Sequence, residues 1–261
     1  MPDGSRFPTR RTSPAKVADR LIVALDVPSV AEATDLVDKL HGIVFAFKVG
    51  FRLWIEDGID QLIARMIRED KRVFLDAKMY DIGNTIEHAV RAAAVRGFSF
   101  ITVHHNRQVV EAAVAGRGDY NMKIFVVTLL TSLDNENLQD MKIDKTAQQV
   151  VEWNTQRALD FGCDGVIASA SDNLQEIKRI ANQRGKDLII AAPGIRPAGV
   201  SIDDHRRSGT PTQAIENGAD YLIVGRPIYD APHPDVAATA IIREMDDAVR
   251  RIEAARRHAG A

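Results

Sequence analysis

The sequence predicts a single (β/α)8 barrel, an α/β fold in which a closed parallel sheet is surrounded by helices. Eight short segments rich in Val, Ile and Phe recur along the chain, and each is almost continuously apolar. Such runs are expected for parallel strands that are buried on both faces. Amphipathic segments with helical periodicity separate them. Strands that alternate with helices form a parallel sheet, and eight such strands can close into a barrel. A doubly wound open sheet is the alternative fold.

The expected elements follow from the apolar runs and from the helical periodicity. The predicted strands are residues 21–26, 45–50, 72–78, 100–105, 123–130, 165–169, 187–192 and 221–226. The predicted helical segments include residues 29–41, 51–69, 86–97, 146–161, 172–184 and 236–257. Ser29 and Asp172 stand at the start of two helical segments and are predicted N-caps. Gly42, Gly97 and Gly162 stand where helix ends favour a left-handed residue.

Length and composition predict one globular domain. The chain has 261 residues, of which 45% are hydrophobic and 27% charged, so a barrel over residues 21–261 can bury a large core. Residues 1–20 are polar and basic and are expected to form a flexible tail. The formal net charge of −2 does not suggest nucleic acid or a membrane as a partner. Cys163 is the only cysteine, which predicts a buried filler residue and a reducing, cytoplasmic environment.

Polar residues gather at the predicted carboxyl ends of six strands, where barrel enzymes place their active sites. The polar residues are Asp26, Lys48, Asp76, Lys78, Thr131, Ser132, Arg196 and Arg226, and the last two are preceded by Pro193 and Gly225 at the ends of their strands. Because the parallel strands of a barrel all end at one rim, their side chains are expected to form one site.

The third predicted strand carries the most informative charges. Asp76 and Lys78 are two residues apart, so they share one face of an extended strand. Asp81 follows at the turn toward the next helix, and Lys48 lies on the neighbouring strand. We therefore expect an alternating array of Lys48, Asp76, Lys78 and Asp81. A salt-bridge network that only closes the barrel mouth is the structural alternative. Burying a charge costs free energy, so a buried salt bridge is poor evidence for stability. Charged groups at this rim therefore favour a functional site over a purely structural network.

Three residues near the last two strands predict a phosphate site. Gly225 allows a ligand to approach the backbone closely, and Arg226 beside it supplies a forked, permanently charged donor. Arg196 approaches from the loop after the seventh strand, and barrels commonly bind phosphate between these two loops. Residues 196–210 are polar and long for a strand–helix connection, which predicts a mobile lid. Together these features indicate a phosphorylated substrate.

The segment DAKMYDIGNT resembles the D-x-K-x-x-D-I-x-N-T signature of the orotidine 5′-phosphate decarboxylase family. The segments VALD, FKVG, TLLTS, PGIRP and VGRPI also occur in the family's order, over residues 21–230. This resemblance implies decarboxylation of orotidine 5′-phosphate to UMP and carbon dioxide, without a metal or an organic cofactor. The D-x-K-x-x-D part alone is shared with sugar-phosphate decarboxylases and synthases of the same superfamily, which need a divalent metal. A barrel that only binds a nucleotide, as a sensor or scaffold, is the non-enzymatic alternative.

The resemblance also implies residue roles. Lys78 would protonate C6 of the pyrimidine, Asp76 would lie beside the substrate carboxylate, and Lys48 and Asp81 would hold the array in register. The implied substrate ligands are Asp26 and Lys48 at the ribose, Thr131 and Ser132 at the pyrimidine edge, Pro193 on the base, and Arg196, Gly225 and Arg226 at the phosphate. The protein would be a homodimer, in which Asp81, Ile82 and Thr85 act in the site of the neighbouring subunit.

The chain departs from the family pattern at a few positions. Tyr80 and Gly83 replace a histidine and a proline that are common in the signature, and these changes should affect the chemistry little. His205 stands where relatives carry a lid glutamine that contacts the phosphate, so we expect His205 to be a pH-sensitive lid ligand. His104 and His105 end the fourth strand, but adjacent strand residues point to opposite faces and cannot chelate one metal together.

Overall fold

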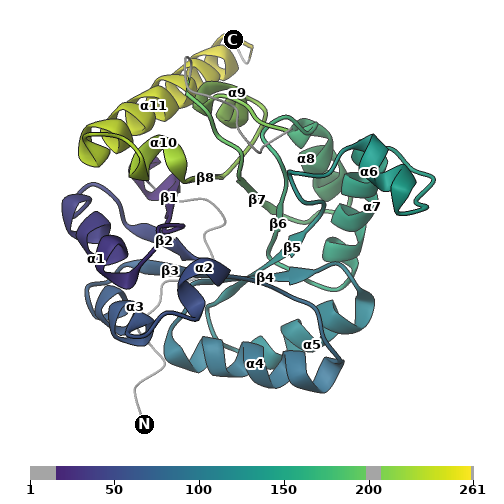
Figure 1. Ribbon diagram of the computed structural model, residues 1–261. Helices are drawn as coiled ribbons and strands as arrows, with labels where there is room; N and C mark the ends of the chain where they lie inside the picture. The colour runs from purple at the N-terminus through teal and green to yellow at the C-terminus, as the bar shows by residue number, and fades with distance from the viewer. Residues whose placement is uncertain (1–15, 198–206, 260–261) are drawn as a thin grey trace.

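A computed structural model describes residues 16–197 and 207–259 of the chain. Its strands form a closed parallel barrel with helices around it (Figure 1). Strand order follows chain order, and β1 pairs with both β2 and β8, which closes the sheet. The predicted (β/α)8 TIM barrel is therefore confirmed. An open doubly wound sheet is excluded, because such a sheet would have two unpaired edge strands.

Each predicted strand segment contains or overlaps one strand of the barrel. The strands are Leu21–Ala24 (β1), Ala46–Val49 (β2), Arg72–Met79 (β3), Phe100–His104 (β4), Lys123–Val127 (β5), Gly165–Ile167 (β6), Ile189–Ala192 (β7) and Tyr221–Val224 (β8). Several strands end before the predicted carboxyl end, because the polar residues there leave the sheet and turn toward the rim.

The helices surround the barrel. They are Val30–Lys39 (α1), Phe51–Trp54 (α2), Ile59–Arg68 (α3), Gly83–Arg96 (α4), Arg107–Arg117 (α5), Asn135–Asp140 (α6), Ala147–Asp160 (α7), Leu174–Gln183 (α8), Pro211–Glu216 (α9), Arg226–Tyr229 (α10) and Pro234–Ala259 (α11). The predicted segment 51–69 is two helices, because Gly58 adopts a left-handed φ of 88° between them. Across residues 16–197 and 207–259, none of the helices is both long and apolar enough to cross a membrane.

The end of the predicted tail is part of the folded barrel. Residues Val17–Arg20 form a short 3-10 helix (η1) directly before β1. The Arg20 guanidinium donates hydrogen bonds to the carbonyl oxygens of Ala219 and Asp220, at 2.7 and 2.9 Å. The first strand is therefore anchored to the start of the last one. Residues 1–15 lie outside the described part of the chain.

The helix ends confirm most of the expected caps. The Ser29 hydroxyl accepts the N–H three residues later and caps α1. Asp172 was predicted to cap α8, and this is wrong: Asn173 caps the helix instead. The Asp172 carboxylate turns inward, where it accepts the N–H of Ser169 at 2.8 Å and forms an ion pair with Arg207.

The glycines that were predicted to end three helices adopt the left-handed conformation. Gly42, Gly97 and Gly162 have φ angles of 77°, 90° and 78°, at or shortly after the ends of α1, α4 and α7. Cys163, which follows the last of these, is buried, and burial raises the pKa of its thiol. The expected role of Cys163 as a buried filler agrees with this environment.

Alternation along the strands positions the site. The rings of Phe74, Phe100 and Phe125 fill the barrel interior, with centroids 5.6 to 5.7 Å apart. A residue two positions after an inward-facing one also faces inward. Asp76 follows Phe74 by two residues, and Lys48 follows the inner residue Ala46 in the same way. The apolar filling of the barrel therefore ends in a charged layer at the carboxyl ends of the strands.

We predict that Gly165→Ala destabilises the barrel. A methyl group at this position would lie 2.5 Å from the Ile189 carbonyl oxygen and 2.6 Å from the Phe125 ring. Overpacking of this kind lowers the free energy of unfolding by about 2 kcal/mol. Chemical denaturation at one protein concentration measures the change. Gly83→Ala is the control, because its new methyl group would lie 3.7 Å from the Cβ of Ala112. Equal stabilities of the two variants would contradict the prediction.

Candidate active site

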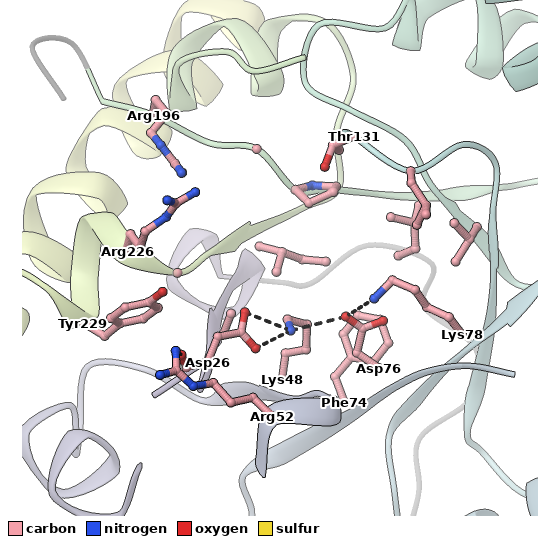
Figure 2. Close-up of a pocket in the computed structure, with 18 of the residues that line it drawn as sticks. Asp26, Lys48, Arg52, Phe74, Asp76, Lys78, Thr131, Arg196, Arg226 and Tyr229 are labelled. Carbon is pink, nitrogen blue, oxygen red and sulfur yellow. Dashed lines mark hydrogen bonds and ion pairs between the residues drawn. The ribbon is translucent and has the colours of Figure 1, made fainter. Parts of the chain in front are cut away.

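A cavity of about 460 Å³ lies at the carboxyl ends of the strands. Nine of the residues predicted from the strand ends line it, and Figure 2 shows most of them around one space. They are Asp26, Lys48, Asp76, Lys78, Thr131, Pro193, Arg196, Gly225 and Arg226. The structure thus brings together residues from β1, β2 and β3 and from the loops after β5, β7 and β8.

The floor of the cavity is a chain of alternating charges. The Lys48 ammonium lies 3.0 and 3.2 Å from the two Asp26 carboxylate oxygens and 3.3 Å from Oδ2 of Asp76. The Lys78 ammonium donates to the same Asp76 oxygen at 2.8 Å. The order is therefore Asp26, Lys48, Asp76 and Lys78, as the dashed lines of Figure 2 show. Each ammonium group is next to at least one carboxylate.

A bulge in β3 places Asp76 and Lys78 in this chain. The register of β3 and β4 shifts between Leu75 and Met79, and Lys78 adopts a positive φ of 41°. The Thr102 hydroxyl on β4 accepts the Lys78 N–H at 2.9 Å and donates to Oδ1 of Asp76 at 2.9 Å. The sequence analysis missed Thr102. A signal was present, because Thr102 continues the inward-facing alternation of β4.

Burial and pairing together set the charge states of the array. Lys48 is 7% exposed and Asp76 is 9% exposed. Burial alone would raise the pKa of Asp76, but attraction to Lys48 and Lys78 and two hydrogen bonds hold this pKa below its ordinary value. Burial alone would lower the pKa of Lys48, but Asp76 and Asp26 raise this pKa above its ordinary value. Both groups are therefore charged at neutral pH.

Cations occupy the other end of the cavity. Figure 2 shows the guanidinium groups of Arg196 and Arg226 at the end away from Lys78. Arg52 lines the cavity and donates to the Asp26 carbonyl oxygen at 2.9 Å. Tyr229 also lines the cavity, one turn after Gly225 and Arg226. The sequence analysis missed Arg52 and Tyr229, although each directly follows a strand-end motif. Forked guanidinium donors are suited to a phosphate group.

The two ends of the predicted lid, residues 196–210, lie side by side. The N–H of Arg196 donates to the carbonyl oxygen of Gly209 at 2.9 Å, and Ile195 and Gly209 form an isolated parallel bridge. Residues 198–206 lie outside the described part of the chain, and His205 is among them. The lid and its histidine ligand therefore stay predictions.

Arg207 connects the end of that segment to the loop after β5. Its guanidinium donates to the Asp172 carboxylate at 2.5 Å and to the carbonyl oxygens of Leu129 and Leu130 at 3.2 and 3.1 Å. These carbonyls directly precede Thr131, which lines the cavity. The sequence analysis did not anticipate this link, because it joins three loops that are far apart in the chain.

Four predicted site residues do not line the cavity of their own chain. Asp81, Ile82, Thr85 and Ser132 are exposed. The Asp81 carboxylate accepts the N–H of Ile82 at 2.6 Å. Within one chain Asp26 is the fourth charge of the array, because the chain leaves the barrel after β3 and Asp81 does not line the cavity. The role of Asp81 in a neighbouring subunit stays a prediction.

The two histidines at the end of the β4 region contact each other at a centroid distance of 6.1 Å, and each also contacts a different third ring. His104 contacts the Tyr80 ring at a centroid distance of 5.5 Å, whereas His105 contacts Trp153 at 6.3 Å. Burial and the positive charge of Lys78 lower the pKa of His104, so this ring is neutral at pH 7. Within residues 16–197 and 207–259, no group of three or more His, Cys, Asp or Glu side chains could hold a metal ion.

A closed (β/α)8 barrel with a charged cavity at its carboxyl rim defines the class of barrel enzymes that act on small anionic substrates. The model of the "Orotidine 5′-phosphate decarboxylase / HUMPS family" matches residues 19–241. The chain belongs to this family.

Similar proteins cover nearly the whole chain. A protein from Nitrobacter winogradskyi named orotidine 5′-phosphate decarboxylase is 45% identical over 232 residues, which are 89% of this chain and 95% of that protein. A protein of the same name from Methylococcus capsulatus is 42% identical, over 90% and 95% of the two chains. The crystal structure of orotidine 5′-phosphate decarboxylase from Lactobacillus acidophilus aligns with a TM-score of 0.72 at 32% identity, over 87% of this chain and 99% of that one.

Two buried aspartates should give opposite pH dependences of stability. The pKa of Asp76 is lowered, so its carboxylate stabilises the fold above the unfolded-state pKa of about 4, and this contribution is lost as the pH falls through the folded pKa. Burial raises the pKa of Asp172 despite Arg207. The contribution of Asp172 is therefore complete below about pH 4 and is lost as the pH rises through its folded pKa.

We predict that acidification from pH 7 to about pH 3.5 lowers the stability of the wild type relative to Asp76→Asn. Over the same range, the stability of the wild type relative to Asp172→Asn should increase. Urea unfolding of the three proteins at several pH values measures both differences. Two differences that change in the same direction would contradict the prediction.

Proposed function

We propose that this protein decarboxylates orotidine 5′-phosphate to UMP and carbon dioxide, the last step of de novo pyrimidine nucleotide synthesis. Family membership and the names of the similar proteins support this substrate. The observation that carries the proposal is the pair of Asp76 and Lys78, 2.8 Å apart, on the floor of a cavity whose other end holds Arg196 and Arg226. The cavity thus combines a site for a reacting carboxylate with a site for a phosphate.

Fixed charge is the proposed source of catalysis. Loss of carbon dioxide from C6 leaves a carbanion that no neighbouring carbonyl group can delocalise. An ammonium group about 4 Å from this carbanion stabilises it by about 4 kcal/mol at an effective dielectric constant of 20. Lys78 supplies this ammonium group in our proposal and then transfers its proton to C6. The array of charges is set by folding, so it needs no reorganisation during the reaction.

Asp76 has two effects in the proposed mechanism. Its carboxylate accepts a hydrogen bond from the Lys78 ammonium group and holds this group in place. Its negative charge also repels the carboxylate of the substrate, and this repulsion disappears as carbon dioxide leaves. Only the difference between the ground state and the transition state changes the rate. Binding of the phosphate by Arg196 and Arg226 supplies free energy that holds the carboxylate against this repulsion.

The other cavity residues are assigned to the nucleoside. We propose that Asp26 and Lys48 bind the ribose hydroxyl groups and that Pro193 packs on the base. Thr131, with Ser132 beside it, reads the pyrimidine edge.

Gly225 allows close approach of the phosphate to the backbone, and the same bound phosphate is the proposed partner of His205. No metal or organic cofactor takes part in this scheme, and a cytoplasmic location stays a prediction.

We further propose that the enzyme is a homodimer in which each subunit completes the site of the other. Asp81 and Thr85 are exposed, and Ile82 has 69% of its surface exposed. Tyr80, next to them, is equally exposed. Large exposed apolar side chains beside charged ones are typical of a surface that another protein covers. A second copy of the chain is the proposed partner.

The first prediction from this proposal concerns activity and metal dependence. The purified protein should convert orotidine 5′-phosphate to UMP at the same rate with and without EDTA, as measured by the loss of substrate absorbance. Lys78→Ala should lower kcat by roughly 1,000-fold, because it removes about 4 kcal/mol of electrostatic stabilisation. Lys39→Ala, on the exposed side of α1, is the control. Activity that depends on added magnesium would instead favour a sugar-phosphate lyase.

The second prediction concerns the shared site. Lys78→Ala and Asp81→Ala should each be inactive alone, but a mixture that exchanges subunits should recover activity. A hybrid dimer contains one site with an intact Lys78 and an intact Asp81 from the partner. Random exchange should therefore leave about a quarter of all sites intact. The mixture should then have about a quarter of the activity of the wild type at the same protein concentration. A mixture that stays inactive although hybrid dimers are detected would place Asp81 in its own subunit's site.

A further inference from the structure

Thr102 stands opposite the irregular part of β3. The two strands are in register at Leu75 and again at Met79, yet β4 advances by only two residues between these points, whereas β3 advances by four. Thr102 is the β4 residue between the two matched positions. The extra residues of β3 therefore face it, and they include Asp76 and Lys78.

The Thr102 hydroxyl joins these two residues. A hydroxyl group has one hydrogen to donate and can accept as well. Thr102 donates to Oδ1 of Asp76 and accepts the backbone N–H of Lys78, both at 2.9 Å. Its side chain is fully buried and does not line the cavity. Thr102 can therefore affect a bound substrate only through the residues that it holds.

The backbone of Lys78 needs such support. Its φ of 41° lies in a region that residues with side chains rarely adopt. Conformations of this kind persist where the surrounding structure holds them, and they gather at active sites. The Lys78 N–H bonds to a side chain of β4 in place of a strand carbonyl group. The Lys78 ammonium is at the same time directed to Oδ2 of Asp76, whose Oδ1 is held by Thr102.

We propose that Thr102 is a positioning residue of the active site. Its hydroxyl sets both the left-handed backbone of Lys78 and the orientation of the Asp76 carboxylate, so that the ammonium group stands where the proton must be delivered. The role of Thr102 in turnover rests on the proposed decarboxylase function. The geometric part of the proposal, a hydroxyl that holds the bulge, does not depend on the substrate.

The test compares three variants of two buried threonines. Thr102→Val keeps the shape of the side chain but removes the donor and the acceptor. Thr102→Ser keeps the hydroxyl and removes only a methyl group. Thr155→Val is the matched control: Thr155 is also fully buried, but its hydroxyl donates to the Val151 carbonyl oxygen within α7, away from the cavity. The measurements are kcat and KM for orotidine 5′-phosphate, the affinity for UMP, and the thermal midpoint.

We expect Thr102→Val to lower kcat by at least about ten-fold, because hydrogen bonds to a charged group and to a strained backbone are lost. The KM and the affinity for UMP should stay within about two-fold, since Thr102 does not touch the ligand. Thr102→Ser should retain most of the wild-type kcat, and Thr155→Val all of it. Equal kcat values for Thr102→Val and Thr155→Val, whatever their thermal midpoints, would overturn the proposal. If Thr102→Val does not fold, Thr102→Ala replaces it with the same expectations.

A second readout is independent of turnover. The Lys78 amide proton is held by a buried hydroxyl group, so it should exchange slowly with solvent in the wild type and in Thr102→Ser, and faster in Thr102→Val. Hydrogen exchange at this amide, measured by NMR, distinguishes a failure of the proposed function from a failure of the proposed role of Thr102. A wild type without activity toward orotidine 5′-phosphate would contradict the proposed function, and the exchange rates would still decide whether Thr102 holds the bulge. Unchanged exchange in Thr102→Val would overturn that geometric claim.

Discussion

The chain of alternating charges from Asp26 through Lys48 and Asp76 to Lys78 is the constraint on which the rest of the site depends. An isolated charge at these depths would lose its hydration without compensation and would become neutral instead. Here the buried Lys48 ammonium and the half-buried Lys78 ammonium each have a carboxylate within 3.3 Å, so opposite charges lie next to one another. The barrel can therefore present a fixed ammonium group to a reacting carbon, in a cavity where an unpaired charge would be unfavourable.

The barrel supplies the geometry for this chain of charges in two ways. Strand alternation stacks Lys48 and Asp76 above the apolar layer that contains Phe74, because each charged residue follows an inward-facing one by two positions. Alternation cannot place Lys78, since the backbone there has left the regular strand conformation. The bulge in β3 and its bonds to Thr102 turn the lysine toward Asp76. Regular strand geometry thus positions Asp76, and the bulge in β3 directs Lys78 toward it.

In the proposed function, the cavity separates phosphate binding from the chemical step. Arg196, Arg226 and Arg52 gather at one end, and Lys78 stands at the other, so an elongated anionic molecule would be held by one end and altered at the other. Arg207, near the end of the predicted lid, is joined to the loop after β5 by hydrogen bonds to two backbone carbonyl groups and to Asp172 by an ion pair. A buried ion pair therefore holds the end of the predicted lid against the loop after β6. Contacts far from the reacting atoms can then supply the free energy that orders the groups around those atoms.

The sequence by itself determined the number and order of the strands, because apolar runs and helical periodicity are local properties of the chain. It also determined that Asp76, Lys78, Arg196 and Arg226 share a rim, since parallel strands end on one side, but the bulge that turns Lys78 toward Asp76 was not predicted. Tertiary structure alone decided that Asp26 is the fourth charge within one chain, and that the Thr102 hydroxyl bonds to both Asp76 and Lys78. These contacts join residues far apart in the chain, and those of Thr102 also depend on a register shift between β3 and β4, which has no signature in either strand's own sequence.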